Sequence, residues 1–492
     1  MEKQLSIKTL DQLSRDVAVP DYDVHKSQCG IVHIGPGAFH RAHQAYYTDL
    51  ALAYGGNWRI HGVSMRSNTL KKALAPQDNL YSLAVVDNTP SLRVIGAIKT
   101  LSTLSEDRGV ITAALCSPAT KIISLTVTEK GYCLNNTGSL DVENPDIQHD
   151  LANPDFPISA VGLITQALKA REHSGDADVT IISCDNVTDN GKKLAKAVID
   201  FAYYLSPELA HWIQDNIAFP CTMVDSITPA TDDEVKSNVS ANLGLKDDWP
   251  IQRETFTQWV IEDHFSGPRP PWEKVGVTFT KDVTFFEKAK LRILNGTHST
   301  LAYVGLLFGK ETVYDAISTP AIQALISELL EREIIPSIKT DSIQTLNQYA
   351  DDIVARYHNK HIRHMLSQIA WDGSQKLPFR ILDTIRDNLH AKREINLLCV
   401  PIAAWCLFVT HKARSGDAIT DPKASTLINL ASQNAFEPIA VTNALLNETV
   451  IFAELSTNSV FRGHVLAQVK SLSAWSSRGV DETLQLLLGE LL

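Results

Sequence analysis

The segment FFEKAKLRILNGTHSTLAYVG (285–305) carries polar side chains at a spacing that suits proton transfer, and its pattern favours one continuous helix. At about 100° per residue, four polar side chains fall within roughly 140° of arc, among leucines. They are Glu287, Lys290, Asn295 and His298. A lysine that faces apolar groups loses hydration, which favours its neutral form and suits it to act as a general base. Asn295 offers an N–H donor to an oxygen on which negative charge develops.

The same spacing also fits a surface helix without catalytic function. Glu287 and Lys290 stand at the i,i+3 separation of an ordinary ion pair on a solvated helix. The residues of this segment alone leave both interpretations open. The sixteen histidines form no H-E-x-x-H, and no Cys/His cluster has zinc-ligand spacing, so we expect no metal site. Without a metal ion, acid–base chemistry at this segment needs a protein acid or base, and a lysine can fill that role.

A second candidate site is the turn Gly35-Pro36-Gly37-Ala38-Phe39, which follows the apolar run GIVHIG (30–35). Gly35 permits a tight turn, Gly37 lets the backbone approach a pyrophosphate, and the following helix start favours an anion. His40 stands where the third glycine of G-x-G-x-x-G is expected. The two glycines alone fit a structural turn equally well. Their place in the first strand–helix turn of the expected sheet favours a cofactor site.

The elements that must position these residues change character along the chain. Short apolar runs alternate with helical stretches in the first half, which predicts a doubly wound parallel sheet. The runs after residue 35 are WRIHGVSM (58–65), SLRVIGAI (91–98), KIISLTVT (121–128) and DVTIISC (178–184). From about residue 283, helical periodicity dominates. We expect an α/β, Rossmann-type domain over residues 1–282 and a mostly α-helical second domain over residues 283–492.

Several longer motifs resemble the long-chain mannitol dehydrogenase family, which includes mannitol 2-dehydrogenase and hexuronate reductases. They are GIVHIGPGAFHRAHQAYYTDL, IISCDNVTDNG and the K-x-x-x-x-N-x-x-H of the lysine helix. Similarity extends from about Tyr22 to Cys406. The resemblance implies an NAD(P)-dependent, zinc-independent oxidoreductase acting on CH–OH groups. It also implies cofactor contacts at Gly35, Pro36, Gly37, Ala38 and Phe39.

The resemblance assigns roles to five polar residues. It implies that Lys290 removes the hydroxyl proton in oxidation and returns it in reduction. Asn295 and Asn186, the asparagine of S-C-D-N, would form the oxyanion hole. His298 would orient the substrate, and Glu287 would connect the lysine to solvent. An ordinary turn is the alternative for Asn186, because Asp-Asn favours turns.

The chain departs from the family where cofactor choice is decided. NAD-specific members carry an acidic pair after Val-Gly-Leu-Arg, whereas VSMRSNTLKK places Asn68 and Thr69 there, after Arg66. A carboxylate at that point would bind the ribose 2′-OH and repel a 2′-phosphate. Lys71 and Lys72 follow closely. We expect NAD from the family, with NADP as the alternative and weak discrimination between the two.

Three further residues stand at strand ends. Thr128 and Glu129 end the run KIISLTVTE, and we expect them near the nicotinamide. Asp225 in MVDSITP matches a substrate-contacting aspartate of the family. The arginine that usually follows this aspartate is Ser226 here.

The substrate is indicated by LSQIAWDGSQKLPFR, which is more similar to the fructuronate reductase branch than to mannitol dehydrogenases. Gln368 replaces the arginine of the mannitol enzymes, while Lys376 is retained. A uronate carries a carboxylate, which arginine binds with two parallel hydrogen bonds. Arg363 and Arg380 flank the segment and are the candidates. Ordinary surface charge is the alternative for both.

Bulk composition limits the possible partners. A formal net charge of −11 argues against nucleic-acid and anionic-membrane surfaces. Seven scattered cysteines without C-x-x-C indicate reduced thiols and a cytoplasmic protein, and the N-terminus has no apolar signal region. The apolar stretch Leu397–Thr410 contains Pro401 and favours a buried helix over a membrane span. We expect a monomer or weak homo-oligomer whose partner is a small sugar acid or polyol.

Three functions remain open at this point. We expect reduction of fructuronate to mannonate with a nicotinamide cofactor. The alternative within the family is a mannitol or arabinitol dehydrogenase. A dinucleotide-binding sensor without catalysis would be expected to lack Lys290, Asn186 or Asn295, and all three are present.

Overall fold

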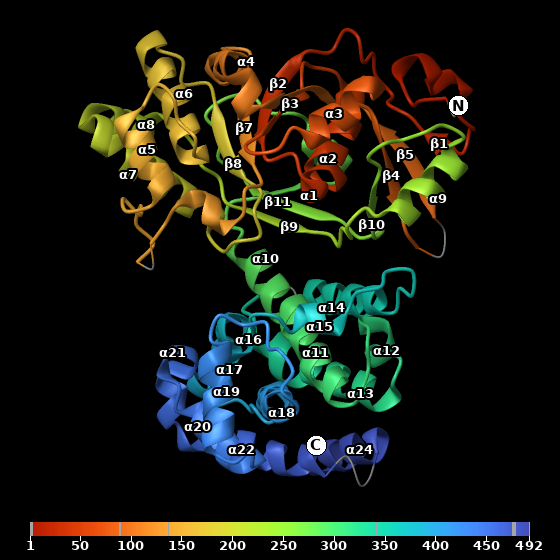
Figure 1. Ribbon diagram of the computed structural model, residues 1–492, viewed down its shortest axis with the longest axis vertical. Coiled ribbons are helices and arrows are strands. Elements are labelled where there is room, and N and C mark those ends of the chain that lie inside the picture. Colours follow the sequence, from red (N-terminus) through yellow and green to blue (C-terminus); the bar gives the residue numbers. More distant parts are fainter. Residues whose placement is uncertain (1–2, 88–89, 136, 341–342, 475–478, 492) are drawn as a thin grey trace. The chain divides into compact units, whose positions relative to one another are not determined.

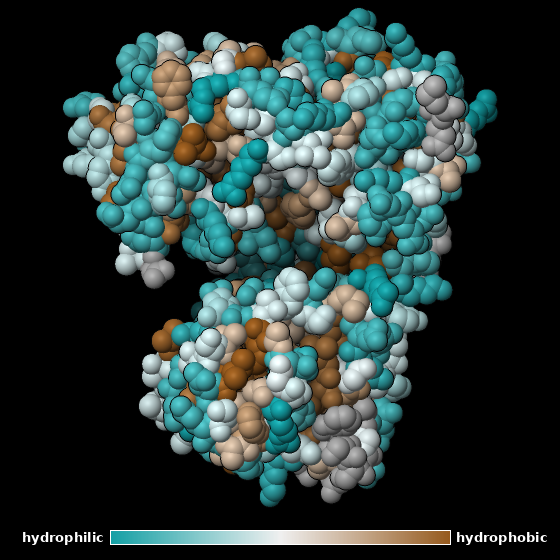
Figure 2. Space-filling view, in the orientation of Figure 1, coloured by the Kyte–Doolittle hydropathy of each residue, from teal (hydrophilic) through white to brown (hydrophobic). Residues whose placement is uncertain are grey.

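The computed structural model describes residues 3–87, 90–135, 137–340, 343–474 and 479–491. It divides the chain into two compact units, Met1–Val283 and Thr284–Leu492. The first unit combines strands and helices, and the second is built from helices (Figure 1). Figure 2 shows a largely hydrophilic face on each unit, interrupted by separate apolar patches.

A five-stranded parallel sheet forms the centre of the first unit. In spatial order its strands are β6 (Ile98–Thr103), β3 (Arg59–Ser64), β2 (Cys29–Ile34), β7 (Ile122–Leu125) and β8 (Thr180–Ser183). The chain moves outward from β2 to β3 and β6, then continues on the other side with β7 and β8. This reversal confirms the doubly wound, Rossmann-type fold expected from the sequence. Ligands of such sheets bind at the carboxyl ends of the strands beside the reversal.

The two faces of this sheet contribute to two different cores. Val32 and Ile34 of β2 share one core with the helices α4 (Leu104–Cys116), α6 (Ala160–Ser174) and α7 (Asn190–Leu205). Ile31, on the opposite face, shares the other core with Trp259 and Trp272. Because both faces are buried, strands of a parallel sheet are apolar throughout instead of alternating.

The run SLRVIGAI is not one strand of the parallel sheet, contrary to expectation. Ser91–Ile95 forms β5, which pairs antiparallel with β4 (Tyr81–Val85) in a separate four-stranded sheet. The break lies at Gly96, whose N–H donates to Asp49 and whose carbonyl accepts from Arg59. These side chains occupy the hydrogen-bonding groups that would continue the strand ladder, so β6 begins only at Ile98.

The helix expected after the glycine turn is divided in two. It consists of α1 (Ala38–Ala42) and α2 (Gln44–Ala51), separated by His43 with φ −121° and ψ −85°. A ring nitrogen of His43 lies 2.8 Å from the carbonyl oxygen of Gln258. This contact holds the chain where the helix breaks.

His40 packs against the sheet at the position of the missing third glycine. Its ring stacks on that of His33 in β2, with centroids 3.5 Å apart and planes 13° apart. His33 also contacts Ser124 Oγ at 2.8 Å and Thr126 Oγ1 at 2.9 Å. Two flat rings thus fill the space between helix and strand that a glycine would otherwise keep narrow. His40 is therefore a buried residue of a packed helix face.

This buried pair makes stability depend on pH. Burial lowers the pKa of His33 from 6.5 to about 3 in the folded protein. Between those pKa values the unfolded chain binds more protons than the folded protein. The free energy of unfolding is therefore highest above pH 6.5 and falls as the pH decreases. From pH 7 to pH 5 we expect a loss of about 2 kcal/mol from His33 alone. Burial also lowers the pKa of His40, so His40→Phe should weaken the dependence.

Urea denaturation of the wild type and of His40→Phe at the two pH values measures this effect. Equal pH dependence in the two proteins would show that His40 binds the same number of protons in the folded and the unfolded state, and would contradict the expectation.

The second unit is organised around α18 (Cys399–Ser415), the apolar helix expected from the sequence. It contacts α11 (Thr297–Leu307), α19 (Ala424–Gln433), α20 (Pro438–Leu446) and α22 (Ser459–Ser473). The buried carboxylate of Glu333 accepts from the N–H groups of Leu397 and Leu398, at 2.9 and 2.8 Å, just before α18 begins. In the part of the chain that the structure describes, no helix has the length and apolar character needed to cross a membrane.

Candidate active site

The glycine turn after β2 has the form of a dinucleotide cradle. Gly35 has φ +88°, and a Cβ there would lie 2.3 Å from the carbonyl oxygen of Thr126. Its N–H donates to Val63 O at 2.9 Å, which ties the turn to β3. Gly37 is exposed, and a Cβ there would meet nothing closer than 3.8 Å. The turn is therefore tightly packed at Gly35, against the backbone that follows β7, and open to solvent at Gly37. The approach of a pyrophosphate requires this combination.

The remaining residues of the turn have different environments. Pro36 is buried and packs at Gly62 of β3, where a Cβ would lie 3.2 Å from its ring. Ala38 and Phe39 are half-buried at the start of α1. The ring of Phe39 stacks on His43 at 5.0 Å.

The edge beyond β3 contains a carboxylate that the sequence analysis missed. Arg66 is exposed there, and Asn68 lies just before α3 (Thr69–Leu74). The side-chain amide of Asn68 donates to Glu106 of α4. Lys71 lies 3.2 Å from Glu106 and 2.6 Å from Asp107. The structure thus revises the expectation that Lys71 is available for a 2′-phosphate, because two carboxylates already hold it.

The loop after β7 is fixed by Asp185, which the sequence analysis also did not identify. Asp185 accepts from the N–H groups of Thr128 at 2.8 Å and Val127 at 3.2 Å, and from the Tyr132 hydroxyl at 3.0 Å. Burial raises the pKa of this carboxyl group. Thr128 takes φ +68°, whereas Glu129 is largely exposed and lies 3.9 Å from Lys193. Thr128 is therefore held in place at the strand edge, and Glu129 is directed to solvent.

Asn186 is exposed directly after β8, at the ligand-binding edge of the sheet. The second asparagine of its motif explains how that loop is held. Buried Asn190 donates to Asp185 O and Thr222 O, both at 3.0 Å, and accepts from the N–H of Thr222 at 2.9 Å. A Cβ at Gly191 would lie 2.5 Å from Phe219 O. In this motif, the side chain of Asn186 is exposed at the sheet edge, whereas the side chain of Asn190 holds the loop in place.

Asp225 is the last residue of β9 (Thr222–Asp225) and is buried. It pairs with Gln258 of β11 (Gln258–Glu262) in an antiparallel ladder. Ser226, which replaces the usual arginine, donates to the carbonyl of Phe256 at 3.0 Å. The Ser226 hydroxyl therefore stabilises the backbone of the loop before β11.

The lysine segment in the second unit is not the regular α-helix that was expected. After α10 (Thr284–Ala289), residues Lys290–Gly296 form a π-helical turn, η6, and α11 follows. On an α-helix, Lys290 and Asn295 would stand about 140° apart. In a π-helix the hydrogen bond joins residues five apart, so these two side chains lie on adjacent turns of the same side. The angular separation of about 140° expected for Lys290 and Asn295 on an α-helix is therefore wrong. The π-helical turn reduces the angle between these two side chains.

Side-chain hydroxyls explain why this turn is stable. The wider turn displaces backbone carbonyls from their α-helical partners. Thr297 Oγ1 bonds to Ile293 O, and Tyr357 OH donates to Leu294 O at 3.0 Å. The two hydroxyls also lie 2.6 Å from each other. Lys290 at the start of the turn is only 8% exposed, and Glu287 in α10 is half-buried.

His298 is a buried, neutral imidazole beside the same turn. Burial holds its pKa well below the usual range, and electrostatic interactions with His364, Arg356 and Arg380 lower that pKa further. Its ring lies 4.8 Å from Tyr357 and 5.1 Å from His364. Nε2 is buried and has no hydrogen-bond partner among the described residues. Such a nitrogen is available to a substrate hydroxyl.

Arg380 lies next to this histidine. It belongs to another π-helical turn, η9 (Pro378–Leu382), which packs so closely that a Cβ on Gly296 would be 3.0 Å from Arg380 O. Nη1 donates to Ser299 Oγ at 3.2 Å, and Nε is buried without a partner. Within the described ranges no carboxylate pairs with Arg380. Burial lowers its pKa, and the same cause lowers that of Lys376 in α16 (Gly373–Leu377).

The other two substrate candidates lie on the surface. The Arg363 side chain is 76% exposed and stands 3.6 Å from Glu311. Gln368 in α15 (Leu366–Ile369) is also exposed. The structure therefore favours the surface-charge interpretation for Arg363 and separates it from Arg380.

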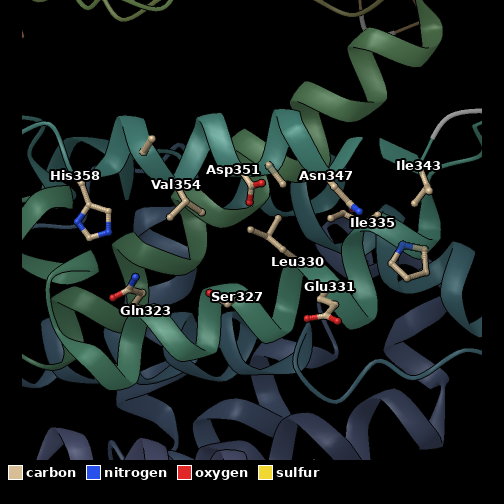
Figure 3. A pocket seen from close by; sticks show the side chains of 13 residues that line it. Gln323, Ser327, Leu330, Glu331, Ile335, Ile343, Asn347, Asp351, Val354 and His358 are labelled. Atoms are coloured by element: carbon tan, nitrogen blue, oxygen red, sulfur yellow. The ribbon is translucent and has the colours of Figure 1, made fainter. Parts of the chain in front are cut away.

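The second unit has a cavity of about 830 Å³ away from these residues. It opens between α13 (Pro320–Leu329) and α14 (Ile343–Tyr357), as Figure 3 shows. None of the candidate residues lines it. Nowhere in the described ranges do three His, Cys, Asp or Glu side chains group so that they could hold a metal ion.

Comparisons with known proteins extend across both units. A family model described as the mannitol dehydrogenase Rossmann domain matches residues 29–274, and the mannitol dehydrogenase C-terminal domain matches residues 282–473. D-mannonate oxidoreductase of Escherichia coli (strain K12) is 40% identical over 94% of this chain and 97% of its own.

Two further relatives differ in the nicotinamide cofactor that their descriptions name. Polyol:NADP oxidoreductase of Gluconobacter oxydans is 38% identical over 83% of this chain and 86% of its own. The structure of Pseudomonas fluorescens mannitol 2-dehydrogenase in a ternary complex with NAD and D-mannitol is 35% identical, with a TM-score of 0.83 over 99% of each chain.

Proposed function

The chain belongs to the mannitol dehydrogenase family, and on that premise we propose that this polyol or sugar-acid oxidoreductase interconverts fructuronate and mannonate with NAD. The single observation that carries the substrate choice is Arg380, a largely buried guanidinium beside His298 that no carboxylate of the described chain neutralises. A desolvated cation of this kind suits a substrate carboxylate.

The glycine turn would hold the cofactor. Gly35 and Gly37 let the backbone approach the pyrophosphate, with Pro36, Ala38 and Phe39 alongside, and the edge beyond β3 would face the ribose. Thr128, fixed by Asp185, would lie on the nicotinamide side. NADH bound there would supply the hydride, and NAD would accept it in the reverse direction.

The second unit would supply the proton. In reduction, Lys290 gives a proton from Nζ to the oxygen of the former carbonyl as negative charge develops there. By the family pattern, Asn295 and Asn186 would donate hydrogen bonds to that oxygen, which would lower the free energy of the charged transition state. Neutral His298 orients a substrate hydroxyl through Nε2, and Glu287 exchanges protons between Lys290 and solvent.

The substrate side is completed by two residues of the family pattern. Lys376 would bind a substrate oxygen close to Arg380, and Asp225 would accept from a substrate hydroxyl. Gln368 would bring no charge to the site. Mannitol oxidation is the alternative, supported by the 35% identity to the mannitol-bound structure and by the retained Lys376.

Rates of the purified protein with fructuronate, fructose, mannitol and arabinitol, each with both nicotinamide cofactors, test the proposal. We expect fructuronate reduction with NADH to have a kcat/KM at least tenfold above that of fructose, because only the acid can pair with Arg380; a factor of ten corresponds to about 1.4 kcal/mol. Efficient fructose reduction without fructuronate activity would instead assign the protein to the polyol branch.

A further inference from the structure

The carboxyl end of β3 lacks the acidic residue that commonly separates NAD from NADP. In doubly wound sheets that carboxylate accepts from the ribose 2′-OH and disfavours a 2′-phosphate. Asn68 and Thr69 stand there instead, and neither is charged. Cofactor choice therefore depends on charges that other elements bring to this edge.

Glu106 reaches the same edge from the neighbouring strand–helix unit. β3 and β6 pair so that Ser64 lies opposite Thr103, and Asn68 and Glu106 follow these two strand ends. The Asn68 amide donates to Glu106 Oε1, and Lys71 Nζ lies 3.2 Å from Oε2. The hydrogen bond from Asn68 and then that from Lys71 lower the pKa of Glu106. Its carboxylate is therefore charged at neutral pH.

Lys71 leaves no surplus positive charge at this position. Its ammonium also lies 2.6 Å from Asp107, and Asp107 accepts from the N–H of Thr103 at 2.8 Å. One lysine between two carboxylates gives the group a net negative charge. A 2′-phosphate would meet like charge here, whereas a 2′-OH can donate a hydrogen bond to Glu106.

We propose that Glu106 selects NAD over NADP, by supplying from α4 the carboxylate that is missing after β3. The inference rests on the proposed dehydrogenase function, and it replaces the weak discrimination expected from the sequence. Arg66 and Lys72 are exposed cations of the same region and would favour NADP. The attraction of these two cations for a 2′-phosphate opposes the repulsion by Glu106.

Binding of NADH and NADPH to the full-length wild type and to Glu106→Gln, measured by isothermal titration calorimetry, tests the proposal. Glutamine keeps the size of the side chain and removes its charge. We expect the wild type to bind NADH at least tenfold more tightly than NADPH. In Glu106→Gln, NADPH should bind about tenfold more tightly than in the wild type, with NADH changed much less, and a factor of ten corresponds to about 1.4 kcal/mol.

Glu208→Gln is the matched control, because Glu208 is an exposed glutamate in the first turn of α8 (Pro207–Asn216). Its ratio of affinities should equal that of the wild type. Equal binding of both nucleotides to the wild type, an unchanged ratio in Glu106→Gln, or the same shift in Glu208→Gln would overturn the role of Glu106. If the wild type binds neither nucleotide, the proposed dehydrogenase function fails as well.

Discussion

Lys290→Ala is expected to lower kcat for sugar-acid reduction by about 10²–10⁴-fold, the usual cost of losing a general acid or base. Lys290 begins the π-helical turn η6, is almost fully buried and lies on the same side as Asn295. Without it, no neighbouring group of the proposed mechanism delivers a proton to the developing alkoxide. NADH affinity should remain within about twofold, a change of roughly 0.4 kcal/mol, because the cofactor turn is in the other unit.

Lys288→Ala provides the control, since Lys288 is exposed in α10, two positions before Lys290. Steady-state rates over a pH series and calorimetric NADH titrations of both variants separate chemistry from binding. A Lys290→Ala enzyme that keeps most of its kcat at neutral pH would remove Lys290 from the mechanism.

Arg380→Ala is expected to lower kcat/KM for fructuronate by more than about 30-fold, or ~2 kcal/mol. The variant loses the cation that would pair with the desolvated substrate carboxylate. Fructose has no carboxylate, so any fructose reduction by the wild type should persist in the variant. The difference between the two substrates distinguishes recognition of the acid from general damage to the site.

Arg363→Ala is the matched control, because the Arg363 side chain is exposed and paired with Glu311. Its kinetics should be those of the wild type for both substrates. Thermal denaturation of both variants checks that the second unit is folded. Equal losses with fructuronate and fructose in Arg380→Ala would assign Arg380 to structure, and an effect confined to Arg363→Ala would reverse the two assignments.

The features that the sequence predicted are those specified by local pattern. The doubly wound sheet follows from apolar runs that alternate with helical segments, and the glycine turn follows from two residues in one loop. The apolar stretch Leu397–Thr410 likewise predicted the buried helix α18. In each case the signal lies in a short stretch of sequence, although the strands of the sheet pair with segments distant in the chain.

The features that were missed depend on contacts between distant segments. The π-helical turn needs the hydroxyl of Tyr357, and no periodicity of the lysine segment indicates that partner. Glu106 meets Asn68 across 38 residues, through the pairing of two strands. The break at Gly96 depends on Asp49 and Arg59. Sequence reasoning placed Arg363 and Arg380 on equal terms, because burial separates them only after the helices have packed.

The π-helical turn η6 also affects how many residues separate Lys290 from Asn295 along the chain. A π turn is an α-helical turn with one residue added, because its hydrogen bond spans five residues instead of four. A relative shorter by one residue, with lysine and asparagine four apart on an ordinary α-helix, would therefore present the same pair. Insertion or deletion of a residue here leaves α10 and α11 in phase. The geometry of the turn, and not a fixed number of intervening residues, therefore defines the lysine–asparagine pair.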